Sequence, residues 1–189
     1  MGKTHHAHWN SVDRIFNQHV YLSQKIRYFD HMKRADFIEG MSRVAATVNV
    51  VTTDGEAGKG GITVSAMTSV SADPPTLLIC IHEESPSCTL IKSNGKFCVN
   101  VLRADQADVS ASFAGLLPFD EMATLNGPEW TTSAHGSPIY RQALVSFDCS
   151  IKQFIQVGTH VIFFGEVLAV SHEDGMPLIY VNRGYQEEK

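Results

Sequence analysis

The stretch Thr63–Ile81, TVSAMTSVSADPPTLLICI, decides the fold that we expect for this chain of 189 residues. Its first half, residues 63–71, places small hydroxyl side chains between valine and alanine, and such alternation is typical of an ordered strand. Hydroxyl residues of this size more often occupy turns and loops, so an ordered run of them calls for an explanation. Pro74–Pro75 then end the run, and the apolar residues 76–81 predict the next strand. Residues 63–71 are called the hydroxyl ribbon below.

The overall composition is that of a globular protein with one core. Hydrophobic residues make up 43% of the chain and charged residues 19%, and the net charge is -5. A negative chain gives no electrostatic case for binding nucleic acid or an anionic membrane. No apolar run approaches the roughly 20 residues that span a bilayer, and the first residues lack the apolar middle of a secretory signal. We therefore expect a cytoplasmic protein with neither a membrane nor a nucleic-acid partner.

The cysteines and the N-terminal histidines do not predict a metal site. Cys80, Cys88, Cys98 and Cys149 form no CxxC pair and no zinc-like spacing, so we expect buried free thiols in a reducing cytoplasm. His5, His6 and His8 could bind a metal adventitiously, but no nearby carboxylate or cysteine completes a site. We expect this histidine cluster to belong to a mobile tail.

The chain is expected to have two parts. Residues 1–34 carry five of the nine histidines and only a loose helical rhythm, which predicts a partly helical N-terminal extension. Residues 35–189 form the predicted main domain. It opens with a helix for which Asp36 is the expected N-cap. One face of that helix carries Phe37, Ile38, Met41, Val44 and Ala45.

After this helix the periodicity changes to that of strands. Predicted strands cover residues 47–53, 62–66, 76–81, 96–102, 145–151, 160–170 and 178–181. Two further helices are predicted. One starts at Ser85–Ser87, with Pro86 in the first turn and Gly95 as C-cap, and the other covers residues 105–114. Residues 115–138 are rich in loop formers. Turns and long excursions join the strands, which predicts a mainly β fold with flanking helices, an antiparallel barrel and not a doubly wound parallel sheet.

Common enzyme signatures are absent from the sequence. The glycines of GKGG lie in a predicted hairpin turn, so they do not form the GxGxxG loop of a Rossmann domain. There is no Walker loop, no GxSxG elbow and no HExxH motif. The carboxylates are dispersed, so no pair stands out for general acid–base chemistry.

The hydroxyl ribbon itself suits a flat ligand. Small side chains allow a planar ring to approach the backbone, whose N–H groups and hydroxyls can bind carbonyl and phosphate oxygens. Ser87 and Thr89 lie at the start of a short helix, where the dipole favours an anion. Together these features suit a phosphorylated planar cofactor. The same residue types also serve as caps and strand ends without any ligand.

Five segments, in order, resemble the flavin reductase-like family with the FMN-binding split-barrel fold. They are GITVSAMTSVSADPPTLLICI, NGKFCVNVL, SFAG, GTHVIFFGEV and GMPLIYVNRGY. Within the family, the nearest resemblance is to the reductase component of two-component flavin monooxygenases of the 4-hydroxyphenylacetate hydroxylase type. The similarity covers about residues 37–185, nearly all of the predicted main domain.

The resemblance implies a homodimer of split barrels that binds FMN or FAD at or near the subunit interface. It implies hydride transfer from NADH or NADPH to the flavin, which is then supplied to a separate oxygenase component. Two alternatives stay open at this point. One is a flavoprotein that reduces another bulky acceptor, such as a corrinoid, and the other is a flavin- or haem-binding module without turnover.

The resemblance also implies roles for individual residues. The residues that would contact the flavin ring are Thr63, Ser65, Ala66, Met67, Ser69, Val70 and Ser71. The residues near the phosphate would be His82, Ser87 and Thr89. Phe113, Ala114 and Gly115 would line the flavin or nicotinamide pocket, and His160 would orient the nicotinamide and the flavin. The protein need only align the reacting atoms, so no catalytic dyad is expected.

One segment departs from the family pattern. Relatives commonly carry Asn or another small polar residue where this chain has His82, followed by Glu83 and Glu84. Carboxylates beside a phosphate repel it unless they point away. This segment leaves the phosphate contacts, and with them the choice between FMN and FAD, open.

Overall fold

The computed structural model describes residues 33–115 and 125–186. The chain divides into two compact units, residues 1–44 and 45–189. In the first unit residues 33–42 are helical, so Asp36 lies inside the helix and its predicted role as N-cap is wrong. Phe37, Ile38 and Met41 of this helix are exposed. The predicted boundary after residue 34 stays a prediction, and the histidine cluster at 5–8 lies outside the described residues.

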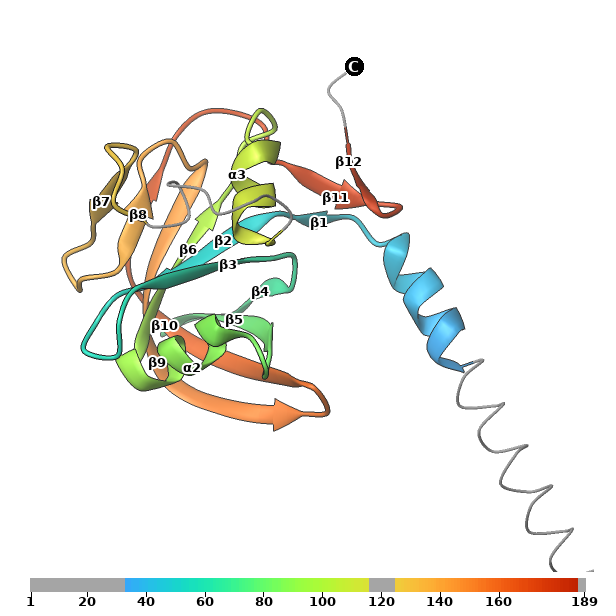
Figure 1. The fold of residues 1–189 in the computed structure, drawn as a ribbon, viewed down its shortest axis with the longest axis horizontal. Helices are drawn as coiled ribbons and strands as arrows, with labels where there is room; N and C mark the ends of the chain where they lie inside the picture. The colour runs from blue at the N-terminus through green and yellow to red at the C-terminus, as the bar shows by residue number, and fades with distance from the viewer. Residues whose placement is uncertain (1–32, 116–124, 187–189) are drawn as a thin grey trace, which may run out of the picture. The chain divides into compact units, whose positions relative to one another are not determined.

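The second unit is built on a seven-stranded antiparallel sheet (Figure 1). Its strand order is β3-β2-β6-β9-β10-β5-β4. In chain order the strands are β2 (Asn49–Thr53), β3 (Gly60–Val64), β4 (Met67–Ala72), β5 (Pro75–His82), β6 (Lys96–Val101), β9 (Val145–Val157) and β10 (His160–His172). Every recorded pairing between these strands is antiparallel. The mainly β, antiparallel prediction is confirmed.

The connection between β3 and β4 shows why the sheet is curled into a barrel. These two strands lie at opposite ends of the strand order, yet only Ser65 and Ala66 separate them in the chain. Three Cα steps of about 3.8 Å reach at most about 11 Å. The two edges of the sheet therefore approach each other where the hydroxyl ribbon crosses between them, which is the geometry of a split barrel.

Two smaller sheets accompany the barrel. The first has the order β1-β11-β12, and its strands are β1 (Ala46–Thr47), β11 (Ile179–Val181) and β12 (Gly184–Tyr185). The second is a hairpin of β7 (Trp130–Thr132) and β8 (Pro138–Tyr140). This hairpin falls partly in the segment predicted to be loop-rich, because strands of three residues give almost no alternating pattern.

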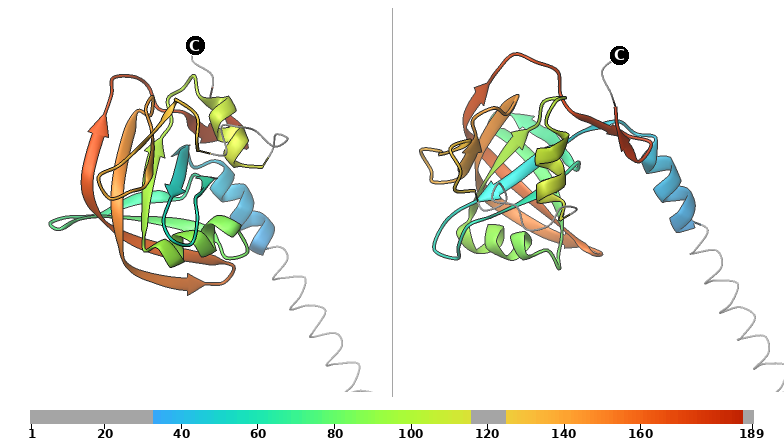
Figure 2. Two further views of the ribbon diagram at one scale, coloured as in Figure 1. Left: turned by 60° about the vertical axis from the view of Figure 1, so that its left-hand side comes forward. Right: turned by 45° about the horizontal axis from the view of Figure 1, so that its top comes forward.

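Two helices pack against β2 and β3. They are α2 (Pro86–Asn94) and α3 (Ala107–Phe113), and the two views in Figure 2 show them at separate places on the barrel. Helix α2 has a proline in its first turn and ends at Gly95, whose φ is 69° and whose N–H donates to the Ile91 carbonyl at 3.1 Å. The predicted start within Ser85–Ser87, the proline in the first turn and the C-cap at Gly95 are confirmed.

Strand β2 separates two apolar clusters because it is buried on both faces. Its neighbours Val51 and Val50 point to opposite sides of the sheet. Val51 belongs to the cluster of the barrel interior and α2, with Ile79, Ile91, Phe97 and Phe163 among its members. Val50 belongs to the cluster beneath α3 and the β7–β8 hairpin, with Leu102, Phe113, Trp130 and Tyr140 among its members.

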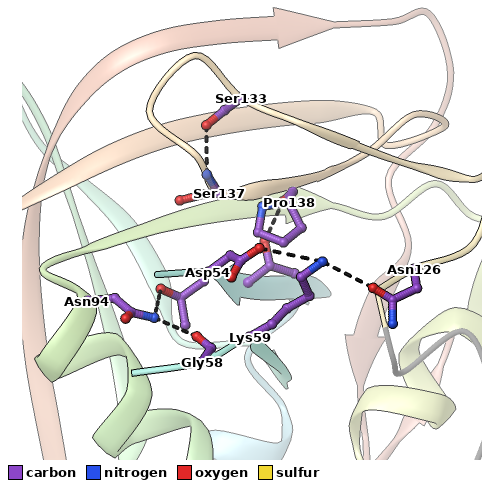
Figure 3. Close-up of polar contacts among 10 residues, drawn as sticks. Asp54, Gly58, Lys59, Asn94, Asn126, Ser133, Ser137 and Pro138 are labelled. Carbon is purple, nitrogen blue, oxygen red and sulfur yellow. Dashed lines mark hydrogen bonds and ion pairs between the residues drawn. The ribbon is translucent and has the colours of Figure 1, made fainter. Parts of the chain in front are cut away.

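The loop between β2 and β3 is fastened to its surroundings, as Figure 3 shows. The Asn94 amide donates to the Gly58 carbonyl at 2.9 Å and to the Thr53 hydroxyl at 3.1 Å. The Lys59 ammonium lies 3.5 Å from an Asp54 carboxylate oxygen and donates to the Asn126 amide oxygen at 3.2 Å. These contacts fix the start of β3, which leads directly into the hydroxyl ribbon.

All four cysteines are free, and three of them are buried. Burial raises the pKa of the Cys149 thiol to about 12, and the neighbouring Asp148 carboxylate adds to the rise. Cys80 is only half-buried, which the sequence analysis did not anticipate. None of the described helices has the length and apolar character needed to cross a membrane.

Candidate functional site

The hydroxyl ribbon is not one continuous strand but two strands joined by a tight kink. The Met67 N–H donates to the Ser65 carbonyl at 3.1 Å, which closes the kink on itself. The Cys80 N–H donates to the Ala66 carbonyl at 3.0 Å, which ties the kink to β5. Ser65 and Ala66 are both exposed. The kink therefore presents small side chains and backbone to solvent while its own position is fixed.

Strand β4 continues the ribbon along the edge of the sheet. Five of its residues are exposed, and Val70 has 50% of its surface accessible next to an irregularity between Ser69 and Ser71. The Ser71 hydroxyl donates to the Asp73 carbonyl at 3.0 Å and accepts from the Asp73 N–H at 3.1 Å, so it serves the turn into β5. Within the described ranges, no hydrogen bond is recorded for the side chains of Thr68 and Ser69. These two hydroxyls can donate to a ligand, whereas the hydrogen of the Ser71 hydroxyl is already used.

Two histidines face each other across the pair of strands β5 and β10. His82 at the end of β5 pairs with His160 at the start of β10, and their rings meet edge to face with centroids 5.2 Å apart. The Glu84 N–H donates to His82 Nδ1 at 3.3 Å, so a neutral His82 carries its proton on Nε2. The Thr159 hydroxyl lies 3.0 Å from His160 Nδ1. His82 thus offers an N–H donor, as the side chain of Asn would at that position.

The carboxylate of Glu83 is partly turned toward the β9–β10 hairpin. It accepts a hydrogen bond from Gln156 Nε2, and the Glu83 N–H donates to the Thr159 carbonyl at 2.9 Å. Burial raises the pKa of the Cys88 thiol in α2, Lys92 opposes the rise and the Glu83 carboxylate adds to it. Of the two charges Lys92 has the larger effect at this thiol, so the Glu83 carboxylate offsets only part of the positive charge near the first turn of α2.

The start of α2 offers few donors to a phosphate. Ser85 at the N-cap position makes no side-chain cap, and Pro86 has no N–H. The Ser87 hydroxyl donates to the Gly61 carbonyl at 2.9 Å, so it holds β3 and is not free to donate to a ligand. Thr89 is exposed. The donors left at this end of the helix are the Ser85 hydroxyl, the Ser87 N–H and the Thr89 hydroxyl.

Phe113 is buried and does not face an open pocket. Its ring stacks edge to face on Trp130 at 5.5 Å. A Cβ added to Gly61 would lie 2.8 Å from Phe113 Cε1, which shows how closely α3 approaches β3. The next two residues, Ala114 and Gly115, are exposed. The structure thus separates the SFAG segment into a core residue and an exposed end.

A cavity of about 230 Å³ opens between the ribbon and the C-terminal hairpin. The Thr63 hydroxyl donates to the Ser110 carbonyl at 2.7 Å and thereby joins β3 to α3 at its wall. The lining residues are Val48, Thr63, Ser65, Ser110, Ala114, Tyr180 and Tyr185. Sequence analysis gave no role to the two tyrosines, although both lie in the quoted segment GMPLIYVNRGY.

The predicted site residues therefore fall into three sets. One set consists of Ser65, Ala66 and Met67 at the kink together with the pair His82 and His160 on the neighbouring strands β5 and β10. A second set lines the cavity and consists of Thr63, Ser65 and Ala114. The remaining predicted residues lie along β4, on α2, in the core beneath α3 or just after that helix, and they are Ser69, Val70, Ser71, Ser87, Thr89, Phe113 and Gly115. Ser65 belongs to both of the first two sets, so the kink and the cavity form one surface.

Comparison with known proteins shows the family to which the chain is similar. The model described as "Flavin reductase like domain" matches residues 41–189. The chain is 45% identical over 161 residues to an FMN reductase (NADH) RutF of Acinetobacter baylyi, covering 84% of each protein. It is 41% identical over 156 residues to the RutF of Serratia proteamaculans, covering 82% of this chain and 88% of that protein.

Among solved structures, the chain is similar to BorF, the flavin reductase component of a bacterial two-component tryptophan halogenase. The sequence identity is 31% and the TM-score is 0.74, with 81% of this chain and 96% of that chain covered.

Proposed function

The chain belongs to the flavin reductase-like family, and on that premise we propose that it transfers a hydride from NADH to FMN and supplies the reduced flavin to a separate oxygenase. The names of the two curated relatives support FMN over FAD and NADH over NADPH. BorF, which acts as one component of a two-component system, supports a separate flavin-consuming partner. The observation that carries the proposal is the exposed kink at Ser65–Ala66, which joins an edge strand with free hydroxyls to a cavity.

The residues around the kink fit a flat ring. The exposed methyl of Ala66 and the small side chains of Ser65 and Ser69 leave the backbone within reach of a planar ligand. The Thr68 hydroxyl can donate to ring oxygens, as can His82 Nε2, because Thr68 pairs with Leu78, which lies on the same face of β5 as His82. A flavin held here accepts from NADH the hydrogen and electron pair of the C4–H bond, which yields NAD⁺ and reduced flavin.

We expect the site to bind the phosphate of the flavin less strongly than it binds the ring. The Ser85 hydroxyl, the Ser87 N–H and the Thr89 hydroxyl are the donors at the start of α2, and the Glu83 carboxylate offsets part of the positive charge of Lys92 there. A weakly held phosphate suits a protein that must release its reduced flavin to a partner. We infer that flavin is a substrate of this protein and not a permanently bound group.

The side chains of the site contribute to the reaction by aligning the two reactants. The His160 ring packs edge to face on His82, and its Nδ1 lies 3.0 Å from the Thr159 hydroxyl, so both neighbours hold the orientation of the ring. Holding two reactants in a near-attack geometry supplies much of the rate of such a transfer. We propose that His160 orients the flavin and the nicotinamide and that no side chain of the site needs to gain or lose a proton.

We further propose that the protein is a homodimer. The second half of β9 is exposed on both faces although it carries Phe154, Ile155 and Val157, and Val170 of β10 is exposed as well. Apolar side chains on both faces of a strand indicate a surface that another chain covers. Light scattering of the purified protein should give the mass of two chains, and Phe154→Asp should lower it.

We propose the cytoplasm as its location. The four free thiols fit a reducing compartment, which also supplies NADH.

The decisive assay mixes the purified protein with NADH and excess FMN and follows nicotinamide absorbance. We expect oxidation that requires flavin and that is slower with NADPH or with FAD. No flavin-dependent oxidation with either nucleotide would overturn the proposal. Flavin that stays bound through purification, with slow turnover of free flavin, would favour reduction of another acceptor, and a haem band would favour a binding module.

A further inference from the structure

The C-terminal hairpin places two tyrosines on the wall of the cavity that faces the ribbon. Tyr180 of β11 pairs directly with Tyr185 of β12. Their rings meet edge to face with centroids 5.8 Å apart, and both side chains are a little over one-third exposed. Thr63 and Ser65 of the ribbon line the same cavity. The proposed function gives this tyrosine pair no role.

Tyr185 is held in a defined position relative to the ribbon. Its hydroxyl donates to Ser110 Oγ at 2.9 Å, and Ser110 is only 1% exposed. The Ser110 carbonyl accepts from the Thr63 hydroxyl at 2.7 Å. A chain of two hydrogen bonds therefore links the Tyr185 ring to the first residue of the ribbon. A side chain fixed in this way is preorganised for a ligand.

The turn that pairs the two tyrosines has an unfavourable backbone. Asn182 has a φ of 51° and Arg183 a φ of 61°, so two successive residues are left-handed. This conformation suits a two-residue hairpin loop, but glycine would satisfy it better than arginine. The hairpin thus holds the tyrosines in register despite an energetic cost, and such costs are often found at functional sites.

The two tyrosines that line the cavity favour a ligand ring that carries an N–H donor. Because Tyr185 uses its hydroxyl hydrogen on Ser110, its oxygen can only accept a hydrogen bond from the cavity. The two aromatic rings favour a planar partner. At about 230 Å³ the cavity is smaller than the 300–1,000 Å³ typical of whole-ligand pockets, so it suits one ring and not a dinucleotide. The carboxamide-bearing ring of NADH meets all three conditions.

We propose that Tyr185, backed by Tyr180 and anchored by Ser110, is a positioning residue that accepts a hydrogen bond from the nicotinamide carboxamide. It thereby fixes the ring of the hydride donor beside a flavin held on the ribbon. The inference rests on the proposed function and adds the group that recognises the donor ring.

The test compares NADH with its 3-acetylpyridine analogue, in which a methyl group replaces the carboxamide NH₂. In the unmodified protein, KM for the analogue should exceed KM for NADH by about tenfold, the size expected for one hydrogen bond. Tyr185→Phe should raise KM for NADH by about tenfold, leave KM for the analogue within about twofold and leave the Kd of FMN within about twofold. Ser110→Ala, which keeps the tyrosine but removes its acceptor, should give the same selective loss. Tyr140→Phe deletes a hydroxyl away from the cavity and should change neither KM.

Each other outcome overturns the inference. If KM rises equally for NADH and for the analogue, or if KM for NADH rises in neither Tyr185→Phe nor Ser110→Ala, Tyr185 makes no contact with the carboxamide. A tenfold loss of FMN affinity in Tyr185→Phe would show that the tyrosine holds the flavin. If the unmodified protein oxidises NADH in a flavin-dependent manner while these results appear, the proposed function stands and this inference alone fails. If it oxidises no NADH, both fail.

Discussion

Strands β2 and β4 contain similar residues but have opposite environments. β2 reads NVVTT and is buried along its whole length, while β4 reads MTSVSA and is almost entirely exposed. In β2 the Thr52 hydroxyl donates to the Pro138 carbonyl at 2.5 Å, and the Thr53 hydroxyl donates to the Lys96 carbonyl at 2.8 Å. In the described part of β4, the only hydroxyl with recorded partners is that of Ser71.

The difference comes from position in the sheet and not from composition. β2 lies between β3 and β6, where its hydroxyls must be satisfied inside the protein, whereas β4 is an edge strand. Hydroxyls that the fold does not use are available to a ligand. The comparison predicts that substitutions in β2 will affect stability and that substitutions in the ribbon will affect flavin binding.

The largest expected effect is at the kink. Ala66→Trp places a bulky ring where the flavin should lie, so the affinity for FMN should fall by about 100-fold or more. Because Ala66 is exposed, the free energy of unfolding should change by less than about 0.5 kcal/mol. Fluorescence titration with FMN and urea unfolding measure the two quantities. Unchanged FMN affinity in a folded variant would show that the ribbon is not the flavin wall.

The next effect concerns the contact between β3 and α3. The added Cβ of Gly61→Ala would lie 2.8 Å from the Phe113 ring, so the ring must move and the protein should lose about 2 kcal/mol of stability. Gly184→Ala is the control, because a Cβ there meets nothing within 4 Å. Thermal or urea unfolding of both variants measures the difference. Equal stabilities would mean that α3 is not closely packed on β3.

A matched pair of threonines tests the comparison of the strands themselves. Thr52→Val removes a buried donor from the Pro138 carbonyl and should cost about 1.5 kcal/mol. Thr68→Val makes the same change on exposed β4 and should cost less than about 0.5 kcal/mol. Urea unfolding and FMN titration of both variants should show loss of stability in the first and loss of affinity in the second. Loss of affinity in Thr52→Val with loss of stability in Thr68→Val would contradict the difference drawn between β2 and β4.

The smallest effect concerns the carboxylate near α2. Glu83→Gln keeps an oxygen for Gln156 but removes the charge, so the affinity for FMN should rise by about two- to fivefold. The gain should shrink as salt is added, because screening weakens the repulsion that the mutation removes. An affinity that falls, or a gain independent of salt, would show that Glu83 does not repel the phosphate.

Sequence analysis predicted the fold where local signals were strong. Pro86 and Gly95 marked the ends of α2 because each residue type has a backbone preference that suits its position. The bounds of β9 could not be predicted as well. Its predicted end at residue 151 reflects the alternation of apolar and polar residues in the sequence, but the strand continues to Val157 through residues exposed on both faces. The pattern is lost there because the barrel offers that segment no buried side.

The site was predicted in outline, and its details depended on tertiary contacts. The small side chains of the ribbon pointed to a flat ligand, and the structure adds the kink at Ser65–Ala66, which no local pattern reveals. The Ser87 hydroxyl donates to the carbonyl of Gly61, which lies 26 residues away in the chain. Tyr185 reaches Ser110 across 75 residues. Such long-range partners decide which polar groups remain free, and sequence spacing does not record them.

The most direct test of the central claim is a crystal structure of the protein with FMN. We predict that the isoalloxazine ring lies in van der Waals contact with the ribbon between Ser65 and Ser69, close to His82 and His160. A ring bound on any other surface, with the ribbon still exposed, would contradict the account.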